Sequence, residues 1–182
     1  MKRDREGSVR TQIARGRHYY QFYKGRNDLF RCAIPFLSLG LEKGEACLWV
    51  VSRSVGIPEA IHALQRACEL APFLDRGQLA VFPAEKWYLD RGRFSERKVF
   101  QKIQKFLEDK RRLGFKAFRG VADLDWLGTE DWSQFQSFEE KAHPLIQDLR
   151  ITAICCYPIQ HCTVTQTSDI LLRHDSVFLS KL

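Results

Sequence analysis

The segment 115–126, which reads FKAFRGVADLDW, combines the residue types that a ligand pocket needs. A short apolar run carries Arg119 in its middle and ends in Asp123, Asp125 and Trp126. A buried guanidinium is costly unless it is paired, so an arginine inside a core strand needs a partner nearby. Because ligands of open α/β sheets bind at the carboxyl ends of the strands, this cluster predicts a binding site there.

A second group of candidate residues, Cys155, Cys156, His161 and Cys162, offers thiolates and an imidazole, which are suitable zinc ligands. Neighbours on a strand point to opposite faces, so this spacing is poor for one metal ion. Small buried thiols in a core strand are the commoner fate of cysteine. A thiol enzyme using Cys156 with His18 or His161 matches no motif, and we expect neither catalysis nor a cofactor.

The connection after the first predicted strand, YKGRND at 23–28, argues against ATP hydrolysis. It contains one glycine and no Gly-Lys-Ser/Thr, so the backbone cradle and the Mg²⁺-binding hydroxyl of a phosphate loop are missing. No Gly-x-Gly-x-x-Gly appears either, which argues against a dinucleotide site.

The elements that must position these residues alternate along the chain. Apolar runs predict strands at 18–23, 46–51, 78–82, within 115–126, at 151–157 and at the edge near 177–180. Helical periodicity predicts helices at 28–41 (with a possible kink at Pro35), 58–68, 95–113, 131–141 and 160–173. This alternation predicts a single α/β domain over 16–182, with a mainly parallel sheet covered on both faces, after a flexible basic arm at 1–15.

The segment 83–94 between two of these elements is predicted to be a long aromatic loop. Trp87 and Tyr88 can close over a ligand as a lid, or they can fasten the loop to the body of the domain. The sequence leaves both interpretations open. The remaining histidines, His62, His143 and His174, are predicted to be surface or capping residues.

The net charge is +7, and basic residues concentrate in the first 17 residues and in the predicted helix around 97–112. A solvated surface is the usual meaning of such runs, with nucleic-acid or protein binding as the alternative. No apolar run reaches the roughly 20 residues that cross a bilayer, and no apolar stretch follows the basic start as in a secretory signal. We therefore expect a cytoplasmic chain with reduced thiols and no membrane partner.

An ordered set of features spans the chain from about residue 16 to 174. It comprises His18, the stretch FLSLGLEKGEACLWVV at 36–51, Gly77-Gln-Leu, the segment from Glu85 to Phe94, Arg119 with Asp123 and Trp126, Glu139 and Cys156. Together these features resemble the MEDS family, the methanogen/methylotroph sensory domain.

The resemblance implies a RecA-like fold without the phosphate loop and a non-catalytic sensory role. The ligands it implies are small organic molecules of the hydrocarbon-derivative class, and a protein partner would receive the signal. Carried over by position, the site candidates are His18, Tyr88, Arg93, Arg119, Asp123, Trp126, Glu139 and Cys156. We expect Arg119 to pair with Asp123 or Glu139 or to hold a polar ligand group, and Tyr88, Trp126 and Tyr157 to supply apolar walls.

Overall fold

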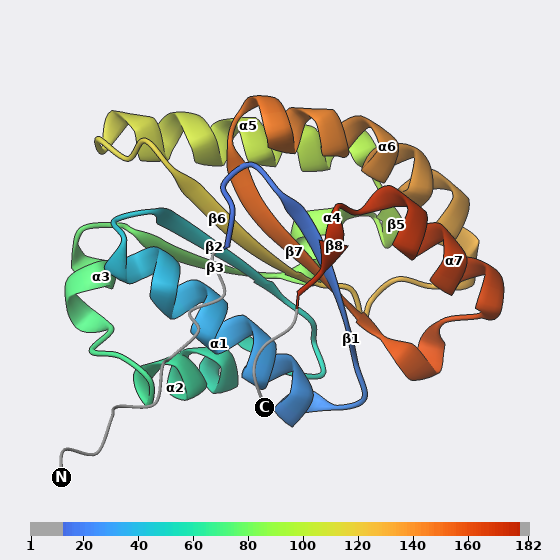
Figure 1. Ribbon diagram of the computed structural model, residues 1–182, viewed down its shortest axis with the longest axis horizontal. Helices are drawn as coiled ribbons and strands as arrows, with labels where there is room; N and C mark the ends of the chain where they lie inside the picture. The colour runs from blue at the N-terminus through green and yellow to red at the C-terminus, as the bar shows by residue number, and fades with distance from the viewer. Residues whose placement is uncertain (1–12, 179–182) are drawn as a thin grey trace, which may run out of the picture.

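The computed structural model of this chain describes residues 13–178, which form an α/β domain with helices on both faces of one sheet (Figure 1). The sheet has six strands in the order β3-β2-β6-β7-β1-β8, and every neighbouring pair is parallel. Its strands are β1 (His18–Tyr23), β2 (Ala46–Val51), β3 (Leu79–Pro83), β6 (Phe118–Asp123), β7 (Ile151–Pro158) and β8 (Ser176–Val177). The predicted fold class is confirmed; most of the predicted arm, residues 1–12, lies outside the described residues.

Two helical layers cover the sheet. One layer contains α1 (Arg26–Glu42), α2 (Ile57–Gln65) and α3 (Ala71–Asp75). The other contains α4 (Ala84–Tyr88), α5 (Glu96–Arg112), α6 (Trp132–Asp148) and α7 (Val164–Arg173), joined by the short helices η1 (Thr129–Asp131) and η2 (Ile159–His161). Each layer has its own apolar core, because side chains along a strand point alternately to the two faces.

Strand register places four residues in one row on the face that α5 and α6 cover. Leu48 of β2 pairs with Gly120 of β6, Gly120 pairs with Ala153 of β7, and Ala153 pairs with His18 of β1. Two of the four are among the smallest residues, so this row leaves room between the sheet and the helices above it.

The helices predicted at 58–68 and 160–173 are shorter than expected, and α1 and α6 also differ from their predicted bounds. Helix α1 begins after Gly25 instead of being capped by Asn27, and it continues through Pro35. Helix α6 continues through Pro144 to Asp148, beyond its predicted end at residue 141. A proline removes one helical hydrogen bond, but the buried apolar faces of both helices hold them against the sheet.

The prediction of a long loop at 83–94 is wrong. The segment forms helix α4 and a hairpin of β4 (Leu89–Asp90) with β5 (Arg93–Phe94). Arg91 and Gly92 connect the two strands with φ values of 50° and 81°, the positive pair that a tight two-residue hairpin turn requires. Trp87 and Tyr88 are 5% exposed, so they hold this segment in the core and no open lid is present.

Among the described residues, none of the helices combines the length and apolar character that crossing a bilayer requires.

Candidate functional site

An apolar cavity of about 130 Å³ lies between the sheet and helices α5 and α6. Its walls come from β1, β2, β6 and β7 below, from α5 and α6 above, and from α4 at one side. Most wall side chains are aliphatic or aromatic, including Leu48, Val50, Trp87, Phe100, Ile103 and Phe138. A dry apolar cavity of about 150 Å³ in another protein holds benzene, so a ligand of that size class fits here.

The cavity exists because the sheet beneath it carries small residues. A Cβ atom added at Gly120 would meet no atom within 4 Å, which means that this glycine faces open space. Ala122 and Ala153, from the same and the adjacent strand, also line the cavity. Interiors are normally packed without such gaps, so a row of small residues under long helices is unusual for a core.

Polar side chains gather beside this cavity. His18 of β1, Glu139 of α6 and Cys155 of β7 line it, and His174, which follows α7, packs its ring 4.1 Å from the ring of His18. His18 Nε2 lies 3.3 Å from Cys155 Sγ and 3.3 Å from Glu139 Oε2. His174 Nε2 lies 3.6 Å from Glu139 Oε2. All four side chains are buried, so this is a concentrated polar group inside an otherwise apolar layer.

Burial controls the charge of this group. Desolvation lowers the pKa of His18 well below its usual value, and His174 and His143 lower it further. Desolvation likewise lowers the pKa of His174 to about 4, although the hydrogen bond with the Ile170 carbonyl opposes this shift. For Glu139, burial raises the pKa to about 8, against the opposing effects of Cys155 and Arg173. The imidazoles are therefore neutral at physiological pH.

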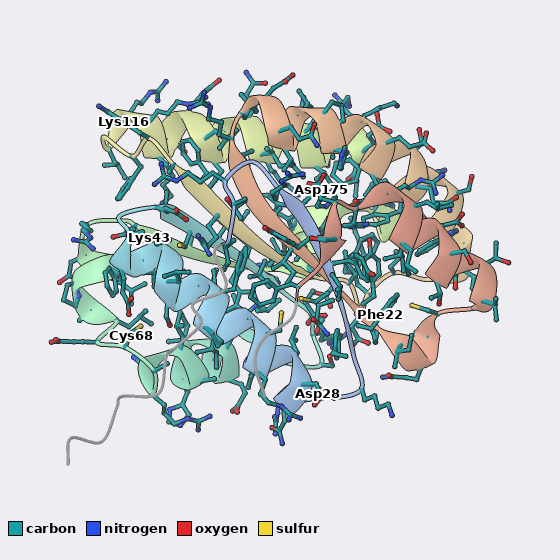
Figure 2. All side chains as sticks on the ribbon, viewed as in Figure 1. Phe22, Asp28, Lys43, Cys68, Lys116 and Asp175 are labelled. Atoms are coloured by element: carbon teal, nitrogen blue, oxygen red, sulfur yellow. The ribbon has the colours of Figure 1, made fainter. Side chains whose placement is uncertain are left out.

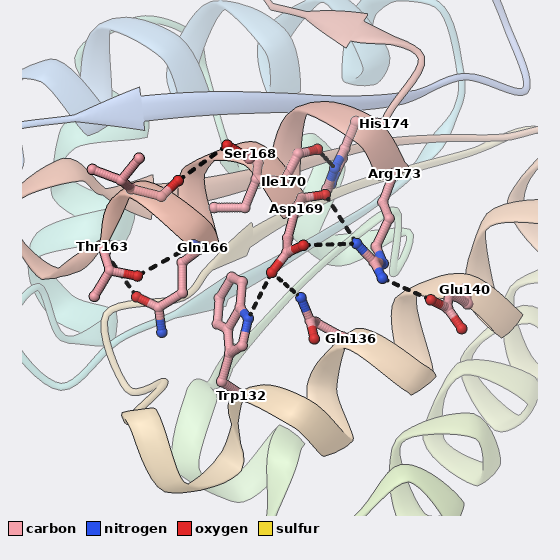
Figure 3. Close-up of polar contacts among 11 residues, drawn as sticks. Trp132, Gln136, Glu140, Thr163, Gln166, Ser168, Asp169, Ile170, Arg173 and His174 are labelled. Atoms are coloured by element: carbon pink, nitrogen blue, oxygen red, sulfur yellow. Dashed lines mark hydrogen bonds and ion pairs between the residues drawn. The ribbon is translucent and has the colours of Figure 1, made fainter.

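Polar contacts between α7 and α6 position His174 (Figure 3). Asp169 of α7 accepts hydrogen bonds from Trp132 Nε1 and from Gln136 on α6. Arg173, the last residue of α7, bonds Glu140 of α6 at 2.7 Å. His174 Nδ1 lies 2.8 Å from the Ile170 carbonyl oxygen, which orients its ring.

The prediction that Arg119 and Trp126 share one pocket is wrong. Arg119 points to the α1 face, where its Nε donates to Glu45 Oε2 at 2.6 Å and its NH1 donates to the Phe36 carbonyl at 3.0 Å. It therefore pairs with neither of its expected partners. Trp126 belongs to the opposite layer, where its ring stacks on that of Tyr88 at 4.7 Å. Side chains along a strand point alternately to the two faces of the sheet, so the Arg119 side chain points away from the cavity and lies in the core of the α1 layer.

Asp123 and Cys156 also point to the α1 face. The carboxylate of Asp123 accepts four hydrogen bonds, from Tyr23 Oη, Ser52 N, Ser52 Oγ and Asp125 N. These contacts fasten the ends of β1, β2 and β6 together and leave the carboxylate occupied by protein donors.

The other candidates divide between the cavity and its surroundings. Tyr88 lines the cavity, whereas Tyr157 packs against His174 with ring centroids 5.9 Å apart. Arg93 lies on the surface, 65% exposed, and its Nε is 3.4 Å from Asp131 Oδ1. Of the nine predicted site residues, the structure brings His18, Tyr88 and Glu139 to the cavity wall with their side chains in the α5–α6 layer.

The predicted metal group is not assembled as proposed. Cys155 joins the polar cluster, but Cys156 faces the opposite layer. His161 is 54% exposed and lies 3.3 Å from Asp125, and Cys162 donates to the Pro158 carbonyl. His174 was predicted to lie at the surface, but it is buried in this cluster. An isolated histidine after a helix carries no local pattern that indicates burial.

The connection between β1 and α1 agrees with the absence of a phosphate loop motif. Only Lys24 and Gly25 join the two elements. The Lys24 backbone N–H donates to the carboxylate of Asp28, in the first turn of α1. An acidic side chain thus occupies the helix N-terminus, where a phosphate would otherwise be favoured.

Charged side chains project outward from α5 and α6 (Figure 2). Several basic residues of α5 are engaged within the chain. Lys98 lies 2.6 Å from Asp90, Lys105 lies 3.0 Å from Asp109, and Lys102 donates to the Trp87 carbonyl at 2.8 Å. These contacts favour a solvated helix face; nucleic-acid binding stays a prediction.

The family model described as the methanogen/methylotroph, DcmR sensory domain (MEDS) matches residues 17–175. The chain belongs to the MEDS family. This domain is similar in fold to a KaiC-like protein from the hyperthermophilic archaeon Pyrococcus horikoshii OT3, with a TM-score of 0.58, 13% identity, and coverage of 86% of this chain and 68% of that one. The RecA-like architecture is thereby confirmed, and no match was found among curated proteins.

Proposed function

We propose that this MEDS domain is a non-catalytic sensor whose ligand, a small and mainly apolar organic molecule, occupies the cavity beneath α5 and α6. The observation that carries the proposal is the open space over Gly120 in an otherwise packed core. The family's sensory character and the cavity's apolar walls support a ligand of the hydrocarbon-derivative class.

The polar cluster lies at one end of this cavity and can therefore orient a bound ligand. His18, Glu139 and Cys155 border it, so a ligand with one polar atom can place that atom toward them and its apolar part among the walls. Such a combination of apolar area and a few fixed polar groups is typical of small-molecule sites.

Ligand binding would affect α4 first, because Trp87 and Tyr88 of this helix line the cavity. Lys102 of α5 donates to the Trp87 carbonyl, which couples α4 to the longer helix. We expect the ligand to shift the equilibrium of α4 and its hairpin, which a protein partner in the cytoplasm would then detect. Hydrogen exchange should slow in residues 84–94 when ligand is added.

A thermal-shift screen of small apolar compounds tests this function. At a concentration about 100-fold above Kd, a binder should raise the melting temperature by about 5–10 °C. The variant Gly120→Val places two methyl groups in the cavity and should lose this response while keeping its own melting transition. A panel without any stabilising compound, or a stabilisation that Gly120→Val retains in full, would overturn the proposal.

A further inference from the structure

The polar cluster beside the cavity brings together four side chains from separate parts of the chain. His18 comes from β1, Glu139 from α6, Cys155 from β7, and His174 from the residue after α7. Each offers one atom that can bind a metal ion, and all four atoms lie within 4.8 Å of one another. The convergence of four buried ligand-type side chains at one point needs an explanation, because burying polar groups is costly.

Hydrogen bonding within the described residues leaves this group incompletely satisfied. The Ile170 carbonyl can only accept, so the proton of His174 lies on Nδ1 and its Nε2 presents a lone pair to the cluster. Neither His174 Nε2 nor Glu139 Oε2 has a hydrogen-bond partner among the described residues, although both are buried. His174 Nε2 and Glu139 Oε2 lie 3.6 Å apart in an apolar layer, and a cation bound between them would give both atoms a partner.

Three of the separations between the ligand atoms fall in the range of the edges of a coordination tetrahedron. With metal–ligand bonds of about 2.0–2.3 Å, tetrahedral edges are about 3.3–3.8 Å. The observed separations are 3.3 Å from His18 Nε2 to Cys155 Sγ, 3.3 Å from His18 Nε2 to Glu139 Oε2, and 3.6 Å from His174 Nε2 to Glu139 Oε2. Cys155 Sγ lies 3.9 Å from the other oxygen of this carboxylate, Glu139 Oε1, and all four ligand atoms lie within 4.8 Å of one another, so the side chains would have to move closer together to complete the tetrahedron.

We infer that His18, Glu139, Cys155 and His174 form a binding site for one zinc ion. Two imidazoles, one thiolate and one carboxylate are ligands that zinc accepts in tetrahedral geometry, and the thiolate disfavours magnesium and calcium. The hydrogen bond from His174 Nδ1 to a backbone carbonyl is the outer contact that commonly orients a metal-binding histidine.

This inference goes beyond the proposed function and does not depend on it. Zinc would bind whether or not an organic ligand enters the cavity. Because three of the four side chains also border the cavity, the ion would lie at the polar end of the cavity.

Metal titration of the full chain tests the site. The protein is stripped with a chelator, dialysed, and titrated with Zn²⁺ and separately with Co²⁺, and bound metal is measured by elemental analysis. We expect one metal ion per chain. The cobalt form should show the intense visible bands of tetrahedral coordination and a thiolate-to-cobalt charge-transfer band in the ultraviolet.

Variants identify the ligands. Cys155→Ser should abolish the charge-transfer band and His174→Gln should weaken zinc binding by about 100-fold or more, since even outer contacts of metal sites contribute 10–100-fold. The matched control is Cys156→Ser, whose side chain lies on the opposite face of the sheet. Circular dichroism verifies that each variant is folded.

Three results would overturn the inference. They are the absence of a stoichiometric tetrahedral cobalt spectrum in the wild-type chain, loss of the charge-transfer band in Cys156→Ser, or its persistence in Cys155→Ser. The first applies even if both ligand variants fail to fold, and it would identify the cluster as a neutral hydrogen-bonded group.

Discussion

Arg119 Nε donates to Glu45 Oε2 at 2.6 Å, and both side chains are almost completely buried, at 1% and 2% exposure. The guanidinium also lies over the Phe36 ring, 4.5 Å from its centroid. This pair joins β6 to the residue before β2 and to α1. Arg119 therefore stabilises the α1 layer, and it is absent from the polar end of the cavity.

Replacing Glu45 by Ala should lower the free energy of unfolding by about 3–5 kcal/mol, because an uncompensated guanidinium would remain buried. Urea unfolding followed by circular dichroism measures this. The double variant Glu45→Leu with Arg119→Met should recover much of the loss, since apolar residues of similar volume often replace a buried pair without penalty. A loss below about 1 kcal/mol in Glu45→Ala would show that the pair is not as buried as described.

Gly40 of α1 is required by the close approach of the same arginine. An added Cβ would lie 2.6 Å from Arg119 Cδ and 2.8 Å from Cys47 Sγ. Gly40→Ala should therefore destabilise the domain by about 1–3 kcal/mol, despite the better helix propensity of alanine. Gly120→Ala is the matched control, because its added Cβ meets no atom within 4 Å and should be neutral or stabilising. Equal effects of the two variants in urea unfolding would contradict this packing.

The Asp123 carboxyl gives a pH-dependent prediction. Burial raises its pKa, while hydrogen bonds from Ser52 and Tyr23 favour the charged form and oppose the shift. A raised folded-state pKa means that the group's contribution to stability is lost as the pH rises through that pKa. Ser52→Ala removes a donor to the charged form, so it should cost about 1.5–3 kcal/mol at neutral pH and less in acid. Urea unfolding at several pH values checks this; a cost independent of pH would contradict it.

Asp169 positions the proposed zinc ligand His174 through the contacts of α7 with α6. Asp169→Ala should weaken cobalt binding by about tenfold and reduce the tetrahedral bands, because His174 is held less firmly. Ser168→Ala, which removes only an exposed bond to the Val164 carbonyl on the same helix, should bind cobalt normally. If both variants bind cobalt like the wild type, the Asp169 contacts do not position the site.

The strands of the sheet could be predicted from the sequence. Strands of a parallel sheet are nearly continuous apolar runs, and turn residues mark where these runs begin and end. β1 and β2 have their predicted bounds, and the β6 segment was identified. The site was harder to predict. Arg119 and Cys156 were assigned to it, but whether a strand residue faces one layer or the other depends on the three-dimensional register. His174 reaches the cluster only through the packing of α7, for which the local sequence contains no indication.

The most direct test of the sensor assignment is a set of nuclear Overhauser effects between a stabilising compound and methyl groups of the protein. We predict contacts to the methyls of Leu48, Val50 and Ile103, which line the cavity. Contacts confined to exposed methyls such as those of Leu171 and Leu172 would contradict a ligand beneath α5 and α6.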